Sequence, residues 1–226
     1  MRLSRWRMAG AVTCLIAGPL GQLVQYLVSP MKEANSPSVQ VAAAVAHPQS
    51  MHAAVILDVL LLLLLPAVLY AGRVAGAAWS RLAAAGTALA FVSMLGAGYL
   101  LAQDVVVSAA AVQPDPHAAA ALVSAYENNA VVTGITVVYL AGHVVGFVML
   151  GIALVRSKAV PRWAGIALCL WPVGEMVGEA AGLTAVAAVG FALLLLAFGA
   201  CALALVSGRE ASAAQLVPSA AERAVV

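Results

Sequence analysis

The sequence predicts an all-α, polytopic membrane protein in which six transmembrane helices form one bundle. Three observations favour this fold class. Hydrophobic residues make up 64% of the chain and charged residues only 9%, whereas soluble domains carry about 25% charged residues. Apolar runs long enough to cross a bilayer as a helix, about 20 residues, recur along the whole chain. These runs lack the alternation of apolar and polar residues that is typical of a transmembrane β-barrel.

The predicted spans are, in chain order, residues 9–29, 51–72, 82–103, 131–155, 163–182 and 185–207. The first run follows Arg2, Arg5 and Arg7, as the apolar region of a signal peptide would. It is longer than such a region and no small-residue cleavage site follows it, so we expect it to be retained. Residues 1–208 are therefore predicted to form one transmembrane domain, and residues 209–226 a disordered cytoplasmic tail.

The basic residues predict the orientation of the chain. All but one of the eleven lie before the first span, in alternate connections, or in the tail; they are Arg2, Arg5, Arg7, Arg73, Arg81, Arg156, Lys158, Arg162, Arg209 and Arg223. Since cytoplasmic segments carry an excess of Lys and Arg, both termini are predicted to be cytoplasmic, and only Lys32 lies outside. The expected location is the plasma membrane of a bacterium.

The first and third loops of the chain, residues 30–50 and 113–129, then lie on the outer side. Each begins near a proline and continues into a short stretch rich in Ala and Val with helical potential. We expect each loop to form a short helix at the membrane interface.

The fifth span carries two carboxylates, Glu175 and Glu179, which lie four residues apart and therefore share one face of a helix. A charged residue at the centre of a span costs about 2.5–3.5 kcal/mol, whereas a Leu or Val returns about 0.3–0.6 kcal/mol. Gly174, Gly178 and Gly182 form a repeated GxxxG row beside the carboxylates, as in closely packed helices. This face is predicted to pack against protein.

Polar residues of other spans lie at similar depth. Counted from the outer boundary at 1.5 Å per residue, Asp58 and Glu175 each lie about 10 Å deep, and His143 lies somewhat deeper. Tyr139 falls one turn from His143, and Gln25 extends a polar stripe in the first span.

Two interpretations follow from this arrangement. The first is an outward-facing acidic pocket, formed by Asp58, His143, Glu175, Glu179, Tyr139 and Gln25, that binds or passes a small solute, a cation or a proton. The second is internal hydrogen bonding between helices, with no ligand.

Bound metals, cofactors and nucleic acid are not expected. His47, His52 and His117 lie in the outer loops or at the start of a span without a zinc-binding motif, and the three cysteines fall singly in separate apolar runs. His143 has no second histidine at matching depth that would complete a haem site. The basic residues do not form the continuous face that nucleic acid requires.

Two stretches of the chain resemble a known family. Residues 142–170 read GHVVGFVMLGIALVRSKAVPRWAGIALCL. Residues 46–66 read AHPQSMHAAVILDVLLLLLLP, a short polar turn followed by an apolar span that carries Asp58. These stretches resemble the bacterial domain-of-unknown-function family 4386, whose basic turn before the fifth span is matched by Val160, Pro161, Arg162 and Gly165. The resemblance implies a six-span integral membrane protein and no established activity.

The leading hypothesis for function is the outward-facing pocket in a bundle surrounded by the lipid bilayer. The alternative is a non-catalytic membrane subunit or scaffold that binds a second copy of itself or another membrane protein through its GxxxG faces. The sequence contains no hydrolase or nucleotide-binding motif, which disfavours catalysis of the soluble type. An intramembrane enzyme that works through the glutamates is the third hypothesis, since such sites need not follow short motifs.

Overall fold

A computed structural model of the chain describes residues 4–76 and 80–208. Within these ranges every regular element is a helix and none is a strand, which confirms the predicted all-α class. The predicted disordered tail, residues 209–226, lies outside the described residues.

Ten α-helices and one 3-10 helix make up the described chain. They are α1 (Arg5–Val28), α2 (Pro37–Ala46), α3 (Pro48–Asp58), η1 (Val59–Leu63), α4 (Leu64–Ala75), α5 (Ser80–Gly96), α6 (Gly98–Ala110), α7 (Pro116–Glu127), α8 (Ala130–Ser157), α9 (Arg162–Ala180) and α10 (Thr184–Ser207).

Five helical segments of the described chain are long and apolar enough to cross a membrane, and they mark the chain as a membrane protein. These segments are Arg5–Val28, Pro48–Ala75, Arg81–Ala110, Ala130–Ser157 and Thr184–Ser207. They coincide with five of the six predicted spans. The remaining prediction, 163–182, corresponds to α9, which is 19 residues long but less apolar because it contains Glu175 and Glu179.

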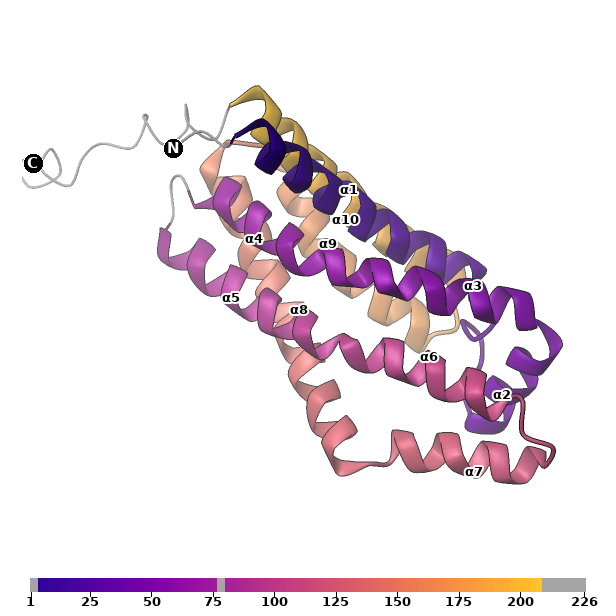
Figure 1. Cartoon of the computed structure of the whole chain (residues 1–226). Helices are drawn as coiled ribbons and strands as arrows, with labels where there is room; N and C mark the ends of the chain where they lie inside the picture. Colours follow the sequence, from indigo (N-terminus) through magenta and orange to yellow (C-terminus); the bar gives the residue numbers. More distant parts are fainter. Residues whose placement is uncertain (1–3, 77–79, 209–226) are drawn as a thin grey trace, which may run out of the picture.

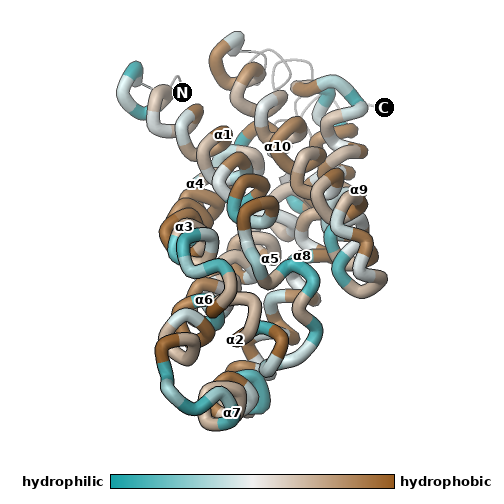
Figure 2. Tube along the Cα trace, turned by 90° about the vertical axis from the view of Figure 1, so that its right-hand side faces the viewer, coloured by the Kyte–Doolittle hydropathy of each residue, from teal (hydrophilic) through white to brown (hydrophobic). Residues whose placement is uncertain are grey.

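Six helices surround the centre of the bundle. Each of α1, α4, α5, α8, α9 and α10 packs against the next in that order, and α10 returns to α1 (Figure 1). Large side chains fill the middle; Leu15, Leu64, Phe147, Trp171 and Phe198 are all at most 2% exposed. Figure 2 shows hydrophobic residues along the bundle helices and more hydrophilic ones in the connections.

Small residues allow the helices of the ring to approach closely. A Cβ added at Gly146 of α8 would lie 2.4 Å from the backbone nitrogen of Ala90 in α5, and one at Gly178 of α9 would lie 2.3 Å from that of Ala187 in α10. Real side chains do not tolerate such distances. Backbone contact through small residues is the usual basis of helix association in lipid.

The second predicted span is interrupted by a 3-10 turn. The chain is α-helical up to Asp58, continues as η1 over Val59–Leu63, and returns to α-helix in α4. Pro66 lies in the first turn of α4 and has no N–H to donate to the carbonyl group of Leu62, four residues earlier. The tighter 3-10 geometry directly before it places a bend beside Asp58.

The two predicted loop helices exist as α2 and α7, each beginning at a proline. In α7 the side chain of Asp115 accepts a hydrogen bond from the backbone N–H of His117 at 2.8 Å, which caps the helix. Both helices lie at the end of the molecule opposite Arg5 and Ser207 (Figure 1). They form a second apolar cluster with the ends of α3 and α6; its buried members are Val41, Ala44, Met51, Val107, Ala110, Ala119 and Val123. Their location at a membrane interface stays a prediction.

Candidate functional site

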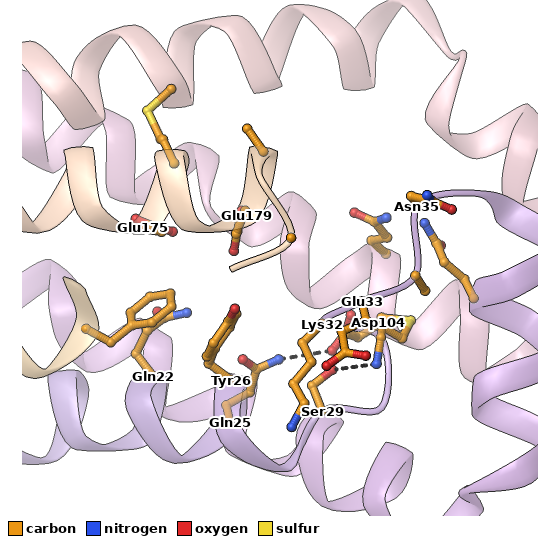
Figure 3. A pocket seen from close by; sticks show the side chains of 18 of the residues that line it. Gln22, Gln25, Tyr26, Ser29, Lys32, Glu33, Asn35, Asp104, Glu175 and Glu179 are labelled. Carbon is orange, nitrogen blue, oxygen red and sulfur yellow. Dashed lines mark hydrogen bonds between the residues drawn. The ribbon is translucent and has the colours of Figure 1, made fainter. Parts of the chain in front are cut away.

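A cavity of about 590 Å³ lies inside the ring, toward the end that carries α2 and α7. All six residues of the predicted pocket line it: Gln25, Asp58, Tyr139, His143, Glu175 and Glu179. They come from α1, α3, α8 and α9, so four helices far apart in the sequence contribute to one site. Figure 3 shows Glu175 and Glu179 extending from α9 toward α1, where Gln22 and Tyr26 face them.

The deepest polar contact joins α8 to α9. His143 Nε2 and Glu175 Oε2 lie 2.8 Å apart and are hydrogen-bonded, with 1% and 10% of the respective side chains exposed. The other ring nitrogen of His143, Nδ1, is buried and has no hydrogen-bond partner among the residues described. The pair therefore satisfies one of the two buried ring nitrogens.

Aromatic rings hold this histidine in place. The ring of His143 lies 4.3 Å from that of Trp171 and 4.9 Å from that of Tyr139, measured between centroids. Phe147 lies on a further side at 5.5 Å. Because Trp171 and Phe147 are fully buried beneath His143, the cavity ends at this aromatic floor and is not an open channel through the bundle.

A second acidic contact joins α3 to α6. The carboxyl groups of Asp58 and Asp104 interact with each other, and Asp104 Oδ2 accepts a hydrogen bond from Gln25 Nε2 at 3.2 Å. Both aspartates are buried, with 4% and 7% exposed. Two carboxylates cannot hydrogen-bond to each other unless one carries a proton, because a carboxylate only accepts. One proton shared by the pair would remove the repulsion between two buried negative charges.

Asp104 was not among the predicted pocket residues. The predicted third span ends at residue 103, which would leave Asp104 beside a loop. The helix continues to Ala110, so Asp104 lies inside the helical segment and turns toward Asp58. The absence of any proline or glycine between residues 99 and 113 was a signal that could have extended this helix.

Acidic side chains outnumber basic ones in the lining of the cavity. Five acidic residues line it, namely Glu33, Asp58, Asp104, Glu175 and Glu179, whereas the described lining contains one lysine and no arginine. That lysine, Lys32, is exposed and donates to the backbone oxygen of Leu27 at 3.0 Å. Its ammonium group is thus held by backbone at the rim. Lys32 and Glu33 follow α1 and lie in the predicted first loop, residues 30–50. Neither was among the predicted pocket residues.

Glutamines connect the cavity to α2 and α7 at its end of the bundle. Gln40 Nε2 of α2 and Gln103 Nε2 of α6 both donate to Glu127 Oε1 of α7, at 2.9 and 3.1 Å. Tyr126 donates from its hydroxyl group to the backbone oxygen of Tyr99 at 2.9 Å. Burial raises the pKa of Tyr126 above its ordinary value, which keeps the phenol protonated as a donor.

The predicted packing glycines take different positions. Gly174 and Gly178 lie against α10, where an added Cβ at Gly174 would meet Gly190 at 3.2 Å. Gly182 follows the end of α9 with a positive φ of 65°, and an added Cβ would meet nothing within 4 Å. The close-packed row therefore ends at Gly178, and α10 of the same chain covers it.

The described residues contain no group of three or more His, Cys, Asp or Glu side chains that could hold a metal ion. Comparison with protein-family models, curated proteins and solved structures finds no match to this chain. The likeness to family 4386 therefore depends on the quoted residues alone and stays a prediction.

Proposed function

We propose that this protein binds a small cationic solute in the acidic cavity, from the outer side of a bacterial plasma membrane. The observation that carries the proposal is the convergence of Asp58, Asp104, Glu175 and Glu179, from three helices, on one cavity with a single lysine at its rim. Carboxylates in a membrane protein are costly and persist where they bind ions, protons or ligands. An acidic cavity concentrates cations and repels anions.

In this proposal α9 also crosses the membrane, as the fifth of six spans. Its 19 residues extend about 28 Å at 1.5 Å per residue, close to the thickness of the hydrocarbon core. Both of its glutamates line the cavity, Glu175 buried and Glu179 exposed, and a polar cavity lowers the cost of inserting them. Six spans place both termini on the same side of the membrane.

The orientation follows from the basic residues. Arg73, Arg81, Arg156 and Arg162 lie at the ends of α4, α5, α8 and α9 that are remote from the cavity. If these residues are cytoplasmic, the cavity opens to the outside.

The binding experiment uses purified full-length protein in lipid nanodiscs. Its thermal unfolding is measured with and without a panel of cations: Na⁺, K⁺, butylammonium and tetramethylammonium. At least one cation is expected to raise the unfolding temperature, because a ligand that binds only the folded state stabilises it.

The matched variant is Glu179→Gln combined with Asp104→Asn, which removes negative charge but keeps side-chain shape. The variant is expected to lose the stabilisation. If no cation in the panel stabilises the wild-type protein, or the variant responds equally, the proposal is rejected.

A further inference from the structure

An apolar groove lies on the exposed side of α10, at the end of the bundle that carries the start of α1 and the end of α10. It is framed by α1, which packs beside α10 (Figure 1), and by the segment that leads into α9. The groove has a volume of about 500 Å³, and none of its lining residues is charged. It is separate from the acidic cavity, with which it shares no lining residue.

A glycine leaves this groove open. Gly199 of α10 lines it, and a Cβ added there would meet only Ile16 Cδ1 of α1, at the ordinary contact distance of 3.8 Å. Three other lining side chains are at least half exposed in the described chain: Trp163 at 51%, Leu196 at 54% and Leu203 at 72%. The groove is therefore an apolar surface that the described helices do not fill.

The length of the groove matches one leaflet of a bilayer. Along α10 the lining extends from Leu195 to Val206, which is about 16 Å at 1.5 Å per residue. The hydrocarbon core of a bilayer is about 30 Å thick, so each leaflet supplies about 15 Å of it. A partner helix that crossed the membrane would follow α10 over its whole length. An acyl chain of one leaflet ends where this groove ends.

Arginines lie at the outer end of the groove, where α1 and α9 begin. Arg162 is exposed and directly precedes the lining residue Trp163. Arg5 is also exposed, and it lies seven residues before Val12 and eleven before Ile16, so that all three share one face of α1. Long arginine side chains reach from an apolar surface to the headgroup level. Half-exposed tryptophans such as Trp163 are also typical of that level.

No acidic residue of the described chain lies beside these arginines. Each one either lines the acidic cavity or belongs to the segment of α7 and its cap, as Asp115 and Glu127 do. The charge next to the groove is therefore positive within the described residues. Arginine binds phosphate through paired, charge-assisted hydrogen bonds, and basic clusters at the membrane surface attract anionic lipids.

We propose that this groove binds an anionic glycerophospholipid of the surrounding bilayer. One acyl chain lies along α10, and Arg5 and Arg162 bind the phosphate and its charged headgroup. A zwitterionic lipid has the same chains and the same phosphate, but its ammonium group is repelled by the two arginines. This proposal does not depend on the function proposed for the acidic cavity.

The test measures contact between lipid chains and Trp163, because bromine on an acyl chain quenches tryptophan fluorescence at short range. The full-length reporter carries Trp6→Phe and Trp79→Phe, which leaves Trp163 in the groove and Trp171, 2% exposed, in the core. It is reconstituted in phosphatidylcholine vesicles, in which brominated phosphatidylglycerol or brominated phosphatidylcholine replaces increasing fractions of the lipid. Phosphatidylglycerol is expected to bind at least about fivefold more tightly, since each basic residue contributes about that factor.

Four variants of the reporter locate the site. Arg5→Gln combined with Arg162→Gln is expected to reduce the preference to about twofold or less. Arg81→Gln is its control, because this exposed arginine begins at α5, a helix that does not line the groove. Gly199→Phe fills the groove and is expected to reduce quenching by both lipids at least about twofold. Gly134→Phe is the matched control, since an added Cβ there meets nothing within 4 Å and the residue does not line the groove.

Three results would overturn the proposal. Equal binding of the two lipids by the reporter excludes an anionic site, and a preference that survives the double arginine variant places the headgroup elsewhere. A loss of quenching that is the same for Gly199→Phe and Gly134→Phe excludes a chain in the groove. If the reporter is a dimer in micelles that only Gly199→Phe dissociates, a second copy of the chain occupies the groove in place of lipid.

Discussion

We expect Asp58 and Asp104 to share one proton, because its release would place two buried negative charges side by side. The same carboxyl groups face the cavity, so a bound cation competes with that proton. Other charged and polar groups line the same cavity, and Glu127 of α7 accepts a hydrogen bond from one of them, Gln103. These lining groups are Gln25, Tyr26, Lys32 and Glu33 from α1 and its following segment, Tyr99 and Gln103 from α6, Tyr139 and His143 from α8, and Glu175 and Glu179 from α9.

Cation affinity is therefore expected to rise with pH. Binding of a cation at the aspartate pair releases the shared proton, so a lower proton concentration favours the bound state. Calorimetry in buffers of different ionisation enthalpy measures the release directly. An affinity that falls as pH rises would contradict the shared-proton account.

The Asp104→Asn variant is expected to fold as stably as the wild-type protein. The asparagine amide can donate to Asp58 in place of the shared proton, so the contact is kept. Asp104→Leu leaves Asp58 without that partner and is expected to lose about 1–3 kcal/mol. Infrared spectra report the protonated carboxyl group directly, and the Asn variant should lose its band. A band that is unchanged in this variant would show that the proton lies elsewhere.

His143 contributes packing as well as a hydrogen bond. Replacement by Ala removes the ring that lies 4.3 Å from Trp171 and leaves Glu175 buried without its partner. The expected loss of unfolding free energy is about 2–4 kcal/mol, measured by denaturation in mixed micelles. His143→Gln keeps a donor for Glu175 and should lose less. Equal losses in the two variants would mean that the hydrogen bond contributes little.

Helix packing in this chain depends on a few backbone contacts. Gly178→Ala is expected to push α9 from α10, because the new Cβ would lie 2.3 Å from the backbone of Ala187. Gly134→Ala is the matched control: it lies within α8, and an added Cβ meets nothing within 4 Å. The control should be neutral or slightly stabilising, since Ala favours helix by about 1 kcal/mol over Gly. Similar unfolding temperatures for both variants would disprove the close contact.

The break in the second predicted span was harder to predict than the helices on either side of it. The second span reads as an uninterrupted apolar run, and the 3-10 turn at Val59–Leu63 results from one missing N–H at Pro66. Membrane helices often continue through a proline, as α1 does at Pro19 and α9 at Pro172. The surroundings of each proline decide the outcome, and a single sequence does not contain them.

The six-span topology is tested on the whole molecule by cysteine labelling. Three substitutions each introduce a cysteine for labelling. Asn35→Cys and Gln113→Cys place it in exposed connections near α2 and α7, and Arg162→Cys places it at the start of α9. A membrane-impermeant maleimide added to intact cells is expected to label the first two, and Arg162→Cys only after permeabilisation. The wild-type protein, whose three cysteines are buried or half-buried, gives the background. Labelling of Arg162→Cys in intact cells would reverse the proposed orientation.

Hydropathy alone determined the class of this protein, because long apolar runs with few charges have no stable form in water and only helices satisfy their backbone groups in lipid. It also identified Glu175 and Asp58 as candidate site residues, since inserting a carboxylate into an apolar span costs free energy. Only the tertiary structure decided their partners. Asp104 pairs with Asp58, and His143 with Glu175, because the ring of helices brings together residues that are 46 and 32 positions apart in the chain. Helix depth can be counted along a sequence, whereas the rotation of each helix and its neighbours are set by side-chain packing around the whole ring.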